Sequence, residues 1–334
     1  MGHRLIYVGH KLLETYPSYT RISWNMVKHC NYNCWYCYDE DNKTNIYDYE
    51  QLTYEKVKNL FDNIQLNYSN REYIKLIYTG GEPTILGYKL FDYIHYGLAC
   101  NNVKEIVLHT NTSKDVKYFE ALNNEFKNNS IEINCTCHLD YINDNNIDEF
   151  IHKITMLSNI KIYVWIMVSN DNYEKAIKYR EIINNYFNKQ IANYKYIQHP
   201  STWDFVNDNK LDVVSDKKNV VYKTDRQHCY YNVDEMMIDN KNNYQGMICM
   251  RGANQLAIQA NGNIYLADCQ WYNKNIFLPA PGLYNKNIML DNNKFITVCN
   301  QKYCKHPSDN YIPKYNVNYY LSSIAKTGYL NMNN

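Results

Sequence analysis

Three closely spaced cysteines near the start of the chain are the residues whose types most clearly indicate chemistry. Cys30, Cys34 and Cys37 form a C-x3-C-x2-C pattern directly after an apolar run that predicts a buried strand. Thiolates bind zinc, copper(I) or iron–sulfur clusters. A structural zinc ion normally takes four protein ligands, and His29 as the fourth would strain the loop because it neighbours Cys30. A [4Fe–4S] cluster on three thiolates keeps one iron open for a small chelating molecule.

A second short motif follows the next predicted strand, at residues 73–78. It reads Gly80-Gly81-Glu82-Pro83. Because glycine has no Cβ, the backbone there can approach a ligand closely, and the glutamate can accept hydrogen bonds from an ammonium group. Taken alone, this motif indicates no more than a turn.

Strands and helices alternate along the first 200 residues. Apolar runs predict strands at residues 22–28, 73–78, 105–109, 131–139, 160–168 and 194–198. Stripes at helical spacing predict helices at residues 53–66, 86–98, 114–126, 146–157 and 173–186, with N-caps at Thr53, at Ser113 and at Asn145 or Asn146. Repeated β–α pairs need crossover connections and therefore predict a parallel sheet. An open barrel and a doubly wound sheet both fit, and both bind ligands at the carboxyl ends of their strands.

The cysteine loop after the first strand and the Gly-Gly-Glu-Pro turn after the second together resemble the radical S-adenosylmethionine (SAM) superfamily. The family's cysteine motif has an aromatic residue before its third cysteine, which is Tyr36 here. The resemblance implies an α/β fold with a partial (β/α)6 TIM-like barrel and a [4Fe–4S] cluster on Cys30, Cys34 and Cys37. It also implies that SAM binds the open iron, and that reduction of the cluster releases a 5′-deoxyadenosyl radical.

The resemblance extends to the ends of the third and fourth strands. Thr110 and Asn111 are similar to the family's frequent T-N-G pattern, although Thr112 replaces the glycine. His138 falls where members place polar residues near the SAM ribose or the substrate, and a structural histidine at the barrel rim is an equal alternative. The expected cofactor-binding residues are therefore Tyr36, Gly80, Gly81, Glu82, Pro83, Thr110, Asn111 and His138. The sequence identifies no catalytic acid, base or radical relay.

Other residues of the predicted barrel have simpler interpretations. Cys135 and Cys137 alternate along the fourth strand and are expected to be small buried residues. Met167 on the fifth strand is as compatible with the core as with an adenine contact. Cys100 is interpreted as a free thiol.

A second group of cysteines lies beyond the predicted barrel. Cys249, Cys269, Cys299 and Cys304, with a predicted hairpin turn at residues 261–263, resemble a SPASM or twitch domain. The resemblance implies that these four cysteines hold an auxiliary [4Fe–4S] cluster, with Cys229 as an alternative ligand. Structural zinc would suit four thiolates equally well.

The predicted organisation has four parts. They are an N-terminal extension at 1–20, a radical SAM barrel at 21–203, an irregular connecting segment at 204–244 and a SPASM/twitch-like domain at 245–334.

Composition restricts the class of protein further. The 334 residues contain 35 Lys and Arg against 34 Asp and Glu, so a nucleic-acid or anionic-membrane partner is not expected. The sequence has neither an apolar run long enough to span a bilayer nor the apolar core of a signal peptide. We therefore expect a soluble, cytoplasmic protein. In a reducing compartment, the odd number of 11 cysteines favours metal ligands over a disulfide framework.

The resemblance implies an oxidoreductase or maturase that abstracts hydrogen from an unactivated C–H bond. The expected electron donor is of the flavodoxin or ferredoxin type. The expected substrate is either a residue of a peptide or protein, which would be oxidised or cross-linked, or a small metabolite. One alternative is a dehydrogenase of a carbohydrate or nucleoside-type metabolite. A second is a non-enzymatic metal-binding or redox-sensing protein. If all four C-terminal cysteines are ligands, the auxiliary cluster is closed and suited to relaying an electron.

Overall fold

The computed structural model describes residues 3–8, 11–17, 19–37, 52–69, 73–198, 219–224, 227–231, 237, 242–249, 251, 255–267, 282–290, 297–299, 304, 312 and 314–315. The chain divides into two compact units. Unit 1 consists of Met1–Ser23, Asp62–Ile74 and Asp216–Asn334, and unit 2 consists of Trp24–Phe61 and Lys75–Ser215.

Six strands form the sheet of unit 2 and run side by side in the order of the sequence. They are β3 (Tyr19–Val27), β4 (Tyr73–Gly80), β5 (Val103–Thr110), β6 (Ile131–Cys137), β7 (Lys161–Val168) and β8 (Ala192–Tyr196). Strands β5 to β8 pair in parallel, for example with Thr110 opposite Cys135 and Cys137 opposite Ile166. The predicted parallel sheet is therefore confirmed, and the strand order is that of the open barrel rather than of the doubly wound sheet.

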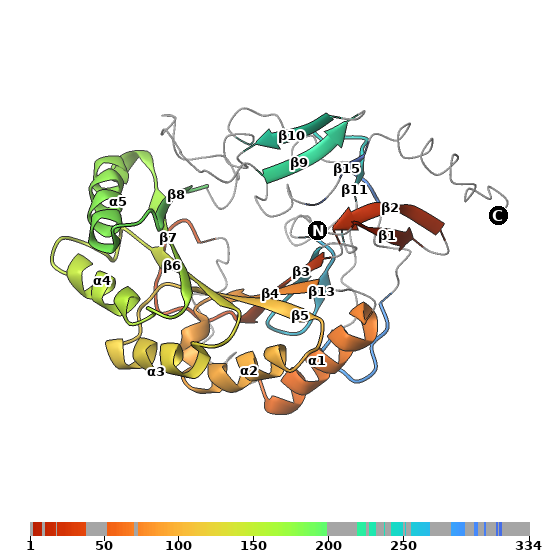
Figure 1. The fold of residues 1–334 in the computed structure, drawn as a ribbon, viewed down its shortest axis with the longest axis horizontal. Helices are drawn as coiled ribbons and strands as arrows, with labels where there is room; N and C mark the ends of the chain where they lie inside the picture. Colours follow the sequence, from red (N-terminus) through yellow and green to blue (C-terminus); the bar gives the residue numbers. More distant parts are fainter. Residues whose placement is uncertain are drawn as a thin grey trace. The chain divides into compact units, whose positions relative to one another are not determined.

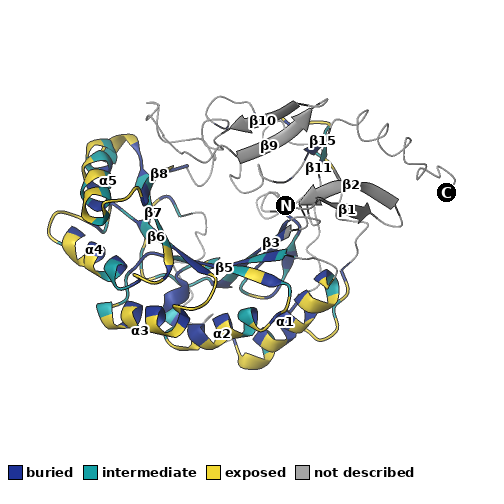
Figure 2. Cartoon of the chain, in the orientation of Figure 1, coloured by how far each residue is buried: buried dark blue, intermediate teal, exposed yellow. Residues whose placement is uncertain are grey.

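Helices connect successive strands and cover one side of this sheet. They are α1 (Tyr54–Tyr68), α2 (Lys89–Leu98), α3 (Val116–Phe126), α4 (Ile147–Thr155) and α5 (Tyr173–Phe187), with short 3-10 turns at Pro83–Leu86 and Asn170–Asn172. Figure 1 shows the helices along the outer side of the curved sheet, and Figure 2 shows that their exposed residues face away from it. This arrangement is a partial barrel, in which none of the helices described lies on the inner face of the sheet. Helices of the described part of the chain are too short or too polar to span a bilayer.

Burial alternates along the central strands because successive side chains point to opposite faces. From Ile133 of β6 and Tyr163 of β7 onward, the buried residues are Ile133, Cys135, Cys137, Val164, Ile166 and Val168. The residues between them are only partly buried, namely Asn134, Thr136, Tyr163, Trp165 and Met167. The apolar set therefore packs against the helices, and the mixed polar and aromatic set lines the inner face. Cys135 and Cys137 are buried core residues, as predicted.

An aromatic cluster fixes the first strands against the helices. Trp24 on β3 is fully buried and its ring lies 5.9 Å from that of Phe61, 5.4 Å from Tyr78 and 6.5 Å from Tyr93. The Tyr78 hydroxyl donates to the carbonyl of Tyr93 at 2.8 Å, so its polar atom is satisfied inside the core. This packing holds the carboxyl end of β3, where the cysteine loop begins.

The predicted helix caps have different outcomes. Thr53 caps α1, because its Oγ1 accepts from the backbone N–H of Lys56 at 3.3 Å. The prediction of Ser113 as the cap of α3 is wrong. The helix begins at Val116, two residues after the predicted start at residue 114. The Asp115 side chain caps it by accepting from Tyr118 N at 2.9 Å. Asn146 precedes α4, but its side chain makes no capping hydrogen bond.

Unit 1 is built from short antiparallel strands. The pairs are β1 (His3–Val8) with β2 (Lys11–Pro17), β9 (Asn219–Thr224) with β10 (Gln227–Tyr231), β12 (Gln255–Ile258) with β13 (Ile264–Tyr265), and β11 (Ile248–Cys249) with both β14 (Thr297–Val298) and β15 (Lys314–Tyr315). The predicted turn at residues 261–263 is confirmed, with Gly262 at a φ of +83°. The interpretation of 204–244 as irregular missed the β9–β10 hairpin, because β-branched and aromatic residues within that segment outweigh its polar average.

Two asparagines one helical turn apart attach a loop to α1 within unit 1. Asn63 Nδ2 donates to the carbonyls of Leu283 at 2.8 Å and Asn285 at 2.7 Å, and its Oδ1 accepts from Ile288 N at 2.9 Å. Asn67 Nδ2 donates to the Ile288 carbonyl at 2.7 Å. Positions i and i+4 lie on the same face of a helix, so the two asparagines can both bond to one continuous stretch of loop, residues 283–288.

Candidate functional site: the cysteine loop and the ends of the strands

The loop after β3 brings the three N-terminal cysteines into one partly buried group. Cys37 N donates to the carbonyl of Cys34 at 3.1 Å, and Tyr32 N lies 3.4 Å from Cys30 Sγ. Burial raises the pKa of Cys30 to about 11, and the nearby charges of Glu82 and Cys37 also raise it. Burial likewise raises the pKa of Cys34 to about 12, with contributions from both other cysteines. The three sulfurs are therefore close enough to interact electrostatically.

The Gly-Gly-Glu-Pro turn is bonded directly to the start of this loop. Gly81 N donates to the carbonyl of Val27 at 2.7 Å, and Glu82 N donates to the carbonyl of His29 at 2.9 Å. A Cβ at Gly81 would lie 2.1 Å from the His29 oxygen, and one at Gly80 would lie 2.4 Å from the Val27 oxygen. The two glycines are thus required because the backbone of β4 packs against the backbone that precedes Cys30.

Glu82 is the most highly bonded side chain of the site. It is 1% exposed, and Oε1 accepts from Thr84 N at 3.0 Å, Thr84 Oγ1 at 2.6 Å and Thr110 Oγ1 at 2.8 Å. Oε2 accepts from Asn111 N at 2.6 Å, and a carboxylate oxygen can accept a second donor. Burial raises the pKa of Glu82, while these donors oppose the shift by stabilising the carboxylate. Glu82 therefore links the ends of β4 and β5.

Residues 110–113 connect the end of β5 to the cysteine loop. Asn111 Nδ2 lies 3.7 Å from Cys30 Sγ and 3.0 Å from Asn31 Oδ1, so this amide points toward the first cysteine. Thr112, which stands where the family often has glycine, has a φ of 57°. That left-handed conformation favours glycine, which explains the family's preference at this position. Asn111 Oδ1 also accepts from Ser113 N at 3.0 Å, and this bond fixes the turn.

His138 lies against the cysteine loop from the other side. Its Nδ1 is 2.8 Å from the Tyr36 hydroxyl and 3.4 Å from Cys34 Sγ, and its ring stacks on that of Tyr36 at 5.9 Å. Burial and, to a smaller extent, the charge of Lys195 together lower the pKa of His138 to about 4. The imidazole is therefore neutral at pH 7. Burial also raises the pKa of Tyr36, so its phenol stays protonated and available as a donor.

Two tyrosines that the sequence analysis did not select complete this contact. The rings of Tyr32 and Tyr141 stack at 3.9 Å with an interplanar angle of 1°. Asn33 N, which lies between the first two cysteines, donates to the Tyr141 hydroxyl. Tyr141 follows His138 by three residues on the same loop. This short distance from His138 was the only feature of the sequence that could have placed Tyr141 at the site.

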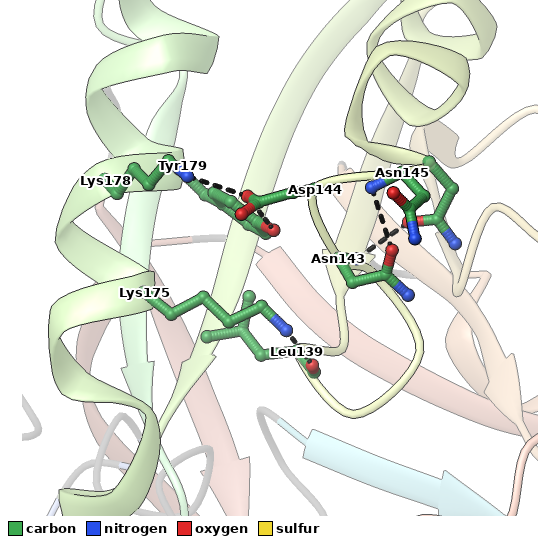
Figure 3. A network of polar contacts seen from close by, with 8 residues as sticks. Leu139, Asn143, Asp144, Asn145, Lys175, Lys178 and Tyr179 are labelled. Carbon is green, nitrogen blue, oxygen red and sulfur yellow. Dashed lines mark hydrogen bonds and ion pairs between the residues drawn. The ribbon is translucent and has the colours of Figure 1, made fainter.

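Helix α5 anchors the loop that carries His138 and Tyr141 (Figure 3). Lys175 Nζ donates to the carbonyl of Leu139 at 2.6 Å. Asp144 Oδ1 accepts from Lys178 Nζ at 2.8 Å and from the Tyr179 hydroxyl at 2.8 Å. The loop after β6 is thus held by α5 on one side while it contacts the cysteine loop on the other.

The remaining single residues of the predicted barrel lie as follows. Met167 packs in a small cluster with Cys34, Tyr36 and Ile197, which puts it beside the cysteine loop. Cys100 is a buried thiol, and its Sγ donates to the carbonyl of Tyr96 at 3.5 Å. Pro83 is buried at the first position of the 3-10 turn that follows Glu82.

Three of the four C-terminal cysteines lie in the described part of unit 1. Cys249 is on β11, opposite Thr297 of β14, and is buried. Cys304 packs against Tyr244, and Cys299 packs against this pair. Cys299 N donates to the carbonyl of Met247 at 2.7 Å, and Cys304 N donates to the carbonyl of Asn242 at 3.1 Å. Cys269 lies outside the described residues, and Cys229 is on β10, where only the backbone is described.

The donor set at the first site fits an iron–sulfur cluster. No three His, Cys, Asp or Glu side chains in the described ranges converge closely enough to hold one metal ion. A [4Fe–4S] cluster makes a different demand, because each cysteine binds a separate iron of the cluster. Three cysteines on one short loop, with the Tyr32 N–H and the Asn111 amide directed at Cys30 Sγ, meet that demand.

Comparison with known proteins finds similarity in structure but not in sequence. No protein-family model matches the chain, and no curated protein matches it. Native anSMEcpe with bound AdoMet is 10% identical, with 83% of each chain covered and a TM-score of 0.51. BtrN in complex with AdoMet and 2-DOIA is 11% identical, with 79% of this chain and 78% of that chain covered and a TM-score of 0.40.

A third structure is Streptococcus suis SuiB bound to the precursor peptide SuiA. It is 12% identical, with 81% of this chain and 64% of that chain covered and a TM-score of 0.38. All three proteins are radical SAM enzymes. The likeness to anSMEcpe shows that the chain has the radical SAM fold, and the predicted partial barrel is confirmed.

Proposed function

We propose that this chain, which has the radical SAM fold, is an enzyme that cleaves SAM reductively to start C–H abstraction. The observation that carries the proposal is the direct bonding of the two motifs. Gly81 N to Val27 O, at 2.7 Å, and Glu82 N to His29 O, at 2.9 Å, join the Gly-Gly-Glu-Pro turn to the root of the cysteine loop. A cluster on that loop would therefore lie beside a carboxylate that can accept from an ammonium group.

The chain's own residues would hold the cofactors as follows. Cys30, Cys34 and Cys37 are the proposed ligands of the [4Fe–4S] cluster. Bound there, the cluster and SAM supply the electron transfer and bond cleavage that give the 5′-deoxyadenosyl radical. The Tyr32 N–H and the Asn111 amide, both directed at Cys30 Sγ, stabilise the anionic thiolate that a metal ligand must be.

Glu82 would orient the cofactor through its second carboxylate oxygen. Its bonds from Thr84 and Thr110 fix the carboxylate plane, so Oε2 keeps one direction in which to accept from the SAM amino group. Asn111, Tyr36 and His138 surround the cysteine loop and are the proposed contacts for the rest of the cofactor. The neutral His138 can accept or donate without adding charge next to the cluster.

The side chains on the inner face of the sheet are suited to binding a polar substrate. Asn134 and Tyr163 are opposite one another on β6 and β7, and Trp165 Nε1 donates to Asn134 Oδ1 at 3.3 Å. Amide and aromatic side chains on a helix-free face can bind a polar molecule with a flat or apolar part. We therefore propose as substrate a peptide or protein residue, to be oxidised or cross-linked, or a small polar metabolite.

The C-terminal cysteines are the proposed ligands of an auxiliary [4Fe–4S] cluster. Cys299 packs against the pair of Cys304 and Tyr244, and Cys249 lies on the strand paired with the segment that leads to Cys299. Cys269 would be the fourth ligand. A cluster closed by four thiolates has no open position for substrate, so its proposed role is to accept the electron left after hydrogen abstraction.

Anaerobic reconstitution with iron and sulfide tests the proposal. With SAM and dithionite, the loaded protein is expected to form 5′-deoxyadenosine. The variant Cys30→Ala, Cys34→Ala, Cys37→Ala should form none, whereas Cys100→Ala, a matched change at a buried cysteine outside the site, should keep the activity. A fully loaded protein that forms no 5′-deoxyadenosine would contradict the proposal and favour a non-enzymatic metal-binding protein.

A further inference from the structure

Two polar side chains converge on the sulfur of Cys34. His138 Nδ1 lies 3.4 Å from Cys34 Sγ and 2.8 Å from the Tyr36 hydroxyl. The Tyr36 hydroxyl also forms a hydrogen bond with Cys34, and this bond opposes the rise in the pKa of Cys34 that burial causes. The sulfur, the phenol and the imidazole thus form one hydrogen-bonded group, in which each member contacts the other two.

The protonation state of Cys34 decides in which direction these bonds run. As a thiol, Cys34 can donate its own proton, but as a metal ligand it is a thiolate and can only accept. Burial raises the pKa of Tyr36, so the phenol keeps a proton to donate at pH 7. With Cys34 as a thiolate, the Tyr36 O–H therefore donates to Sγ. The His138 N–H, placed on Nδ1, then donates to the phenol oxygen beside the same sulfur.

The surroundings of this group strengthen its hydrogen bonds. Cys34 and Tyr36 are buried with Ile197 in one apolar cluster, and Met167 packs against it. The ring of His138 stacks on that of Tyr36, with an interplanar angle of 14°. Hydrogen bonds are electrostatically stronger at low dielectric constant, and donors in a chain polarise one another. These two donors should therefore act on the sulfur more strongly than exposed donors would.

We propose that Tyr36 and His138 are positioning residues that raise the reduction potential of the cluster on the cysteine loop through hydrogen bonds at Cys34 Sγ. The inference rests on the proposed function and adds the control of electron transfer at the same site. Hydrogen bonds to the sulfurs are one of the factors that set the potential of an iron–sulfur cluster. One-electron reduction adds negative charge to the cluster and its thiolates, so donors at Sγ stabilise the reduced form more than the oxidised form.

The consequence for the enzyme concerns two successive electron transfers. A flavodoxin- or ferredoxin-type donor gives one electron to the cluster, and the same electron is then needed to break a carbon–sulfur bond of SAM. A higher potential makes the first transfer more favourable and the second less favourable by the same amount. Tyr36 and His138 would therefore set the balance between accepting the electron and passing it to SAM.

A redox titration of the full chain, reconstituted with iron and sulfide and followed by electron paramagnetic resonance, measures this potential. The signal of the first cluster is the one that disappears in Cys30→Ala, Cys34→Ala, Cys37→Ala. Tyr36→Phe keeps the ring but removes the phenol donor. It should lower the equilibrium constant for reduction about tenfold, which is ~59 mV for one electron. His138→Leu should lower the potential by a smaller amount, because His138 acts through the phenol.

A second variant at His138 separates hydrogen bonding from packing. The side-chain amide of His138→Asn can place an N–H near the position of Nδ1, so this variant should stay close to the unsubstituted protein. The double variant Tyr36→Phe, His138→Leu should shift the potential by less than the sum of the two single shifts, because both residues act on one sulfur. Equal shifts in His138→Asn and His138→Leu would overturn the hydrogen-bonding role of His138.

Tyr78→Phe is the matched control, because Tyr78 is a buried tyrosine whose hydroxyl bonds to the carbonyl of Tyr93 in the aromatic core. It should leave the potential unchanged. If the potential moved in neither Tyr36→Phe nor His138→Leu, or moved equally in Tyr78→Phe, the inference would be overturned and the proposed function would stand. If the reconstituted chain gave no signal that depends on the three cysteines of the loop, the proposed function would fail as well.

Discussion

The two groups of cysteines are organised in opposite ways. The first group lies on one short loop, residues 30–37, and its surroundings come from distant strand ends: Asn111 bonds to that loop, and Gly81 and Glu82 bond to the backbone just before it. The cysteines of the second group extend from Cys249 to Cys304, and Cys249 and Cys299 lie on or next to two-residue strands. The proposed ligands of the first site are thus neighbours in the sequence, and the residues that hold them in place come from distant parts of the chain. The proposed ligands of the second site themselves come from separate parts of the chain.

This difference has an energetic consequence. Bringing distant residues together costs conformational entropy, and the cost grows slowly with the length of chain between them. Short strands such as β11 and β14 contribute few backbone hydrogen bonds to offset it. A cluster on the C-terminal cysteines would therefore act as a cross-link that stabilises unit 1, whereas unit 2 has its aromatic core around Trp24 whether or not metal is bound.

The largest expected effect comes from a methyl group at the junction of the first site. Gly81→Ala would put a Cβ 2.1 Å from the His29 oxygen, and backbone on both sides leaves it little room to move. We expect a loss of about 3 kcal/mol in unfolding free energy. The cysteine loop should also be displaced, so the variant should lose 5′-deoxyadenosine formation. Denaturant unfolding and the SAM cleavage assay measure the two effects.

Gly87→Ala is the control for this substitution. Gly87 has a φ of +59°, but a Cβ there would meet nothing within 4 Å. Strain in the backbone should cost about 1 kcal/mol and leave SAM cleavage intact. If Gly87→Ala abolished cleavage as fully as Gly81→Ala, contact with the cysteine loop would not be the reason for the loss.

The second prediction separates the two sites by function. Cys299→Ser should remove a ligand of the auxiliary cluster and leave the cysteine loop of unit 2 unchanged. We expect 5′-deoxyadenosine formation to remain close to that of the unsubstituted protein, while net oxidation of the substrate is lost. The iron content of the reconstituted variant should be lower than that of the unsubstituted protein by the amount that one cluster holds. Retained substrate oxidation with a full loss of the second cluster would contradict the electron-relay role.

The same comparison explains how much could be predicted from the sequence. Alternation of apolar runs predicted the strands of the sheet and their parallel direction, because each strand and helix is defined by local spacing, whereas the order of the strands was left open. The Cys30–Cys37 spacing predicted a cluster loop for the same reason. Tyr141 and its stacking on Tyr32 could not be predicted, because these residues meet only after β3 and β6 are assembled.

The failures have equally specific causes. Ser113 and Asp115 are both good caps, and the choice between them depends on the turn that Asn111 Oδ1 makes with Ser113 N. The β9–β10 hairpin lies in a segment whose average polarity hides its strand-forming residues. The role of the glycines was predicted as close approach to a ligand, whereas the structure shows close approach to the chain itself.

The third prediction concerns the support of unit 1. Asn63→Ala would leave the carbonyls of Leu283 and Asn285 and the N–H of Ile288 without this partner. We expect a loss of about 2 kcal/mol, seen as faster hydrogen exchange in residues 282–290. Asn124→Ala is the control, because Asn124 is an exposed residue in the middle of α3. Equal exchange in the two variants would show that the Asn63 bonds do not hold the loop.

The smallest expected effect tests whether the first site depends on its neighbours as well as on its own cysteines. Tyr141→Phe keeps the ring that stacks on Tyr32 but removes the oxygen that accepts from Asn33 N. We expect the loss of one hydrogen bond, about 1 kcal/mol, and faster loss of iron to a chelator from the first cluster only. Tyr186→Phe removes a hydroxyl from an exposed tyrosine of α5 and should change neither. The backbone amide of Asn33 lies between Cys30 and Cys34, two of the proposed ligands. If Tyr141→Phe changed neither the rate of iron loss nor the electron paramagnetic resonance spectrum, the cysteine loop would keep its shape without this bond from the loop after β6.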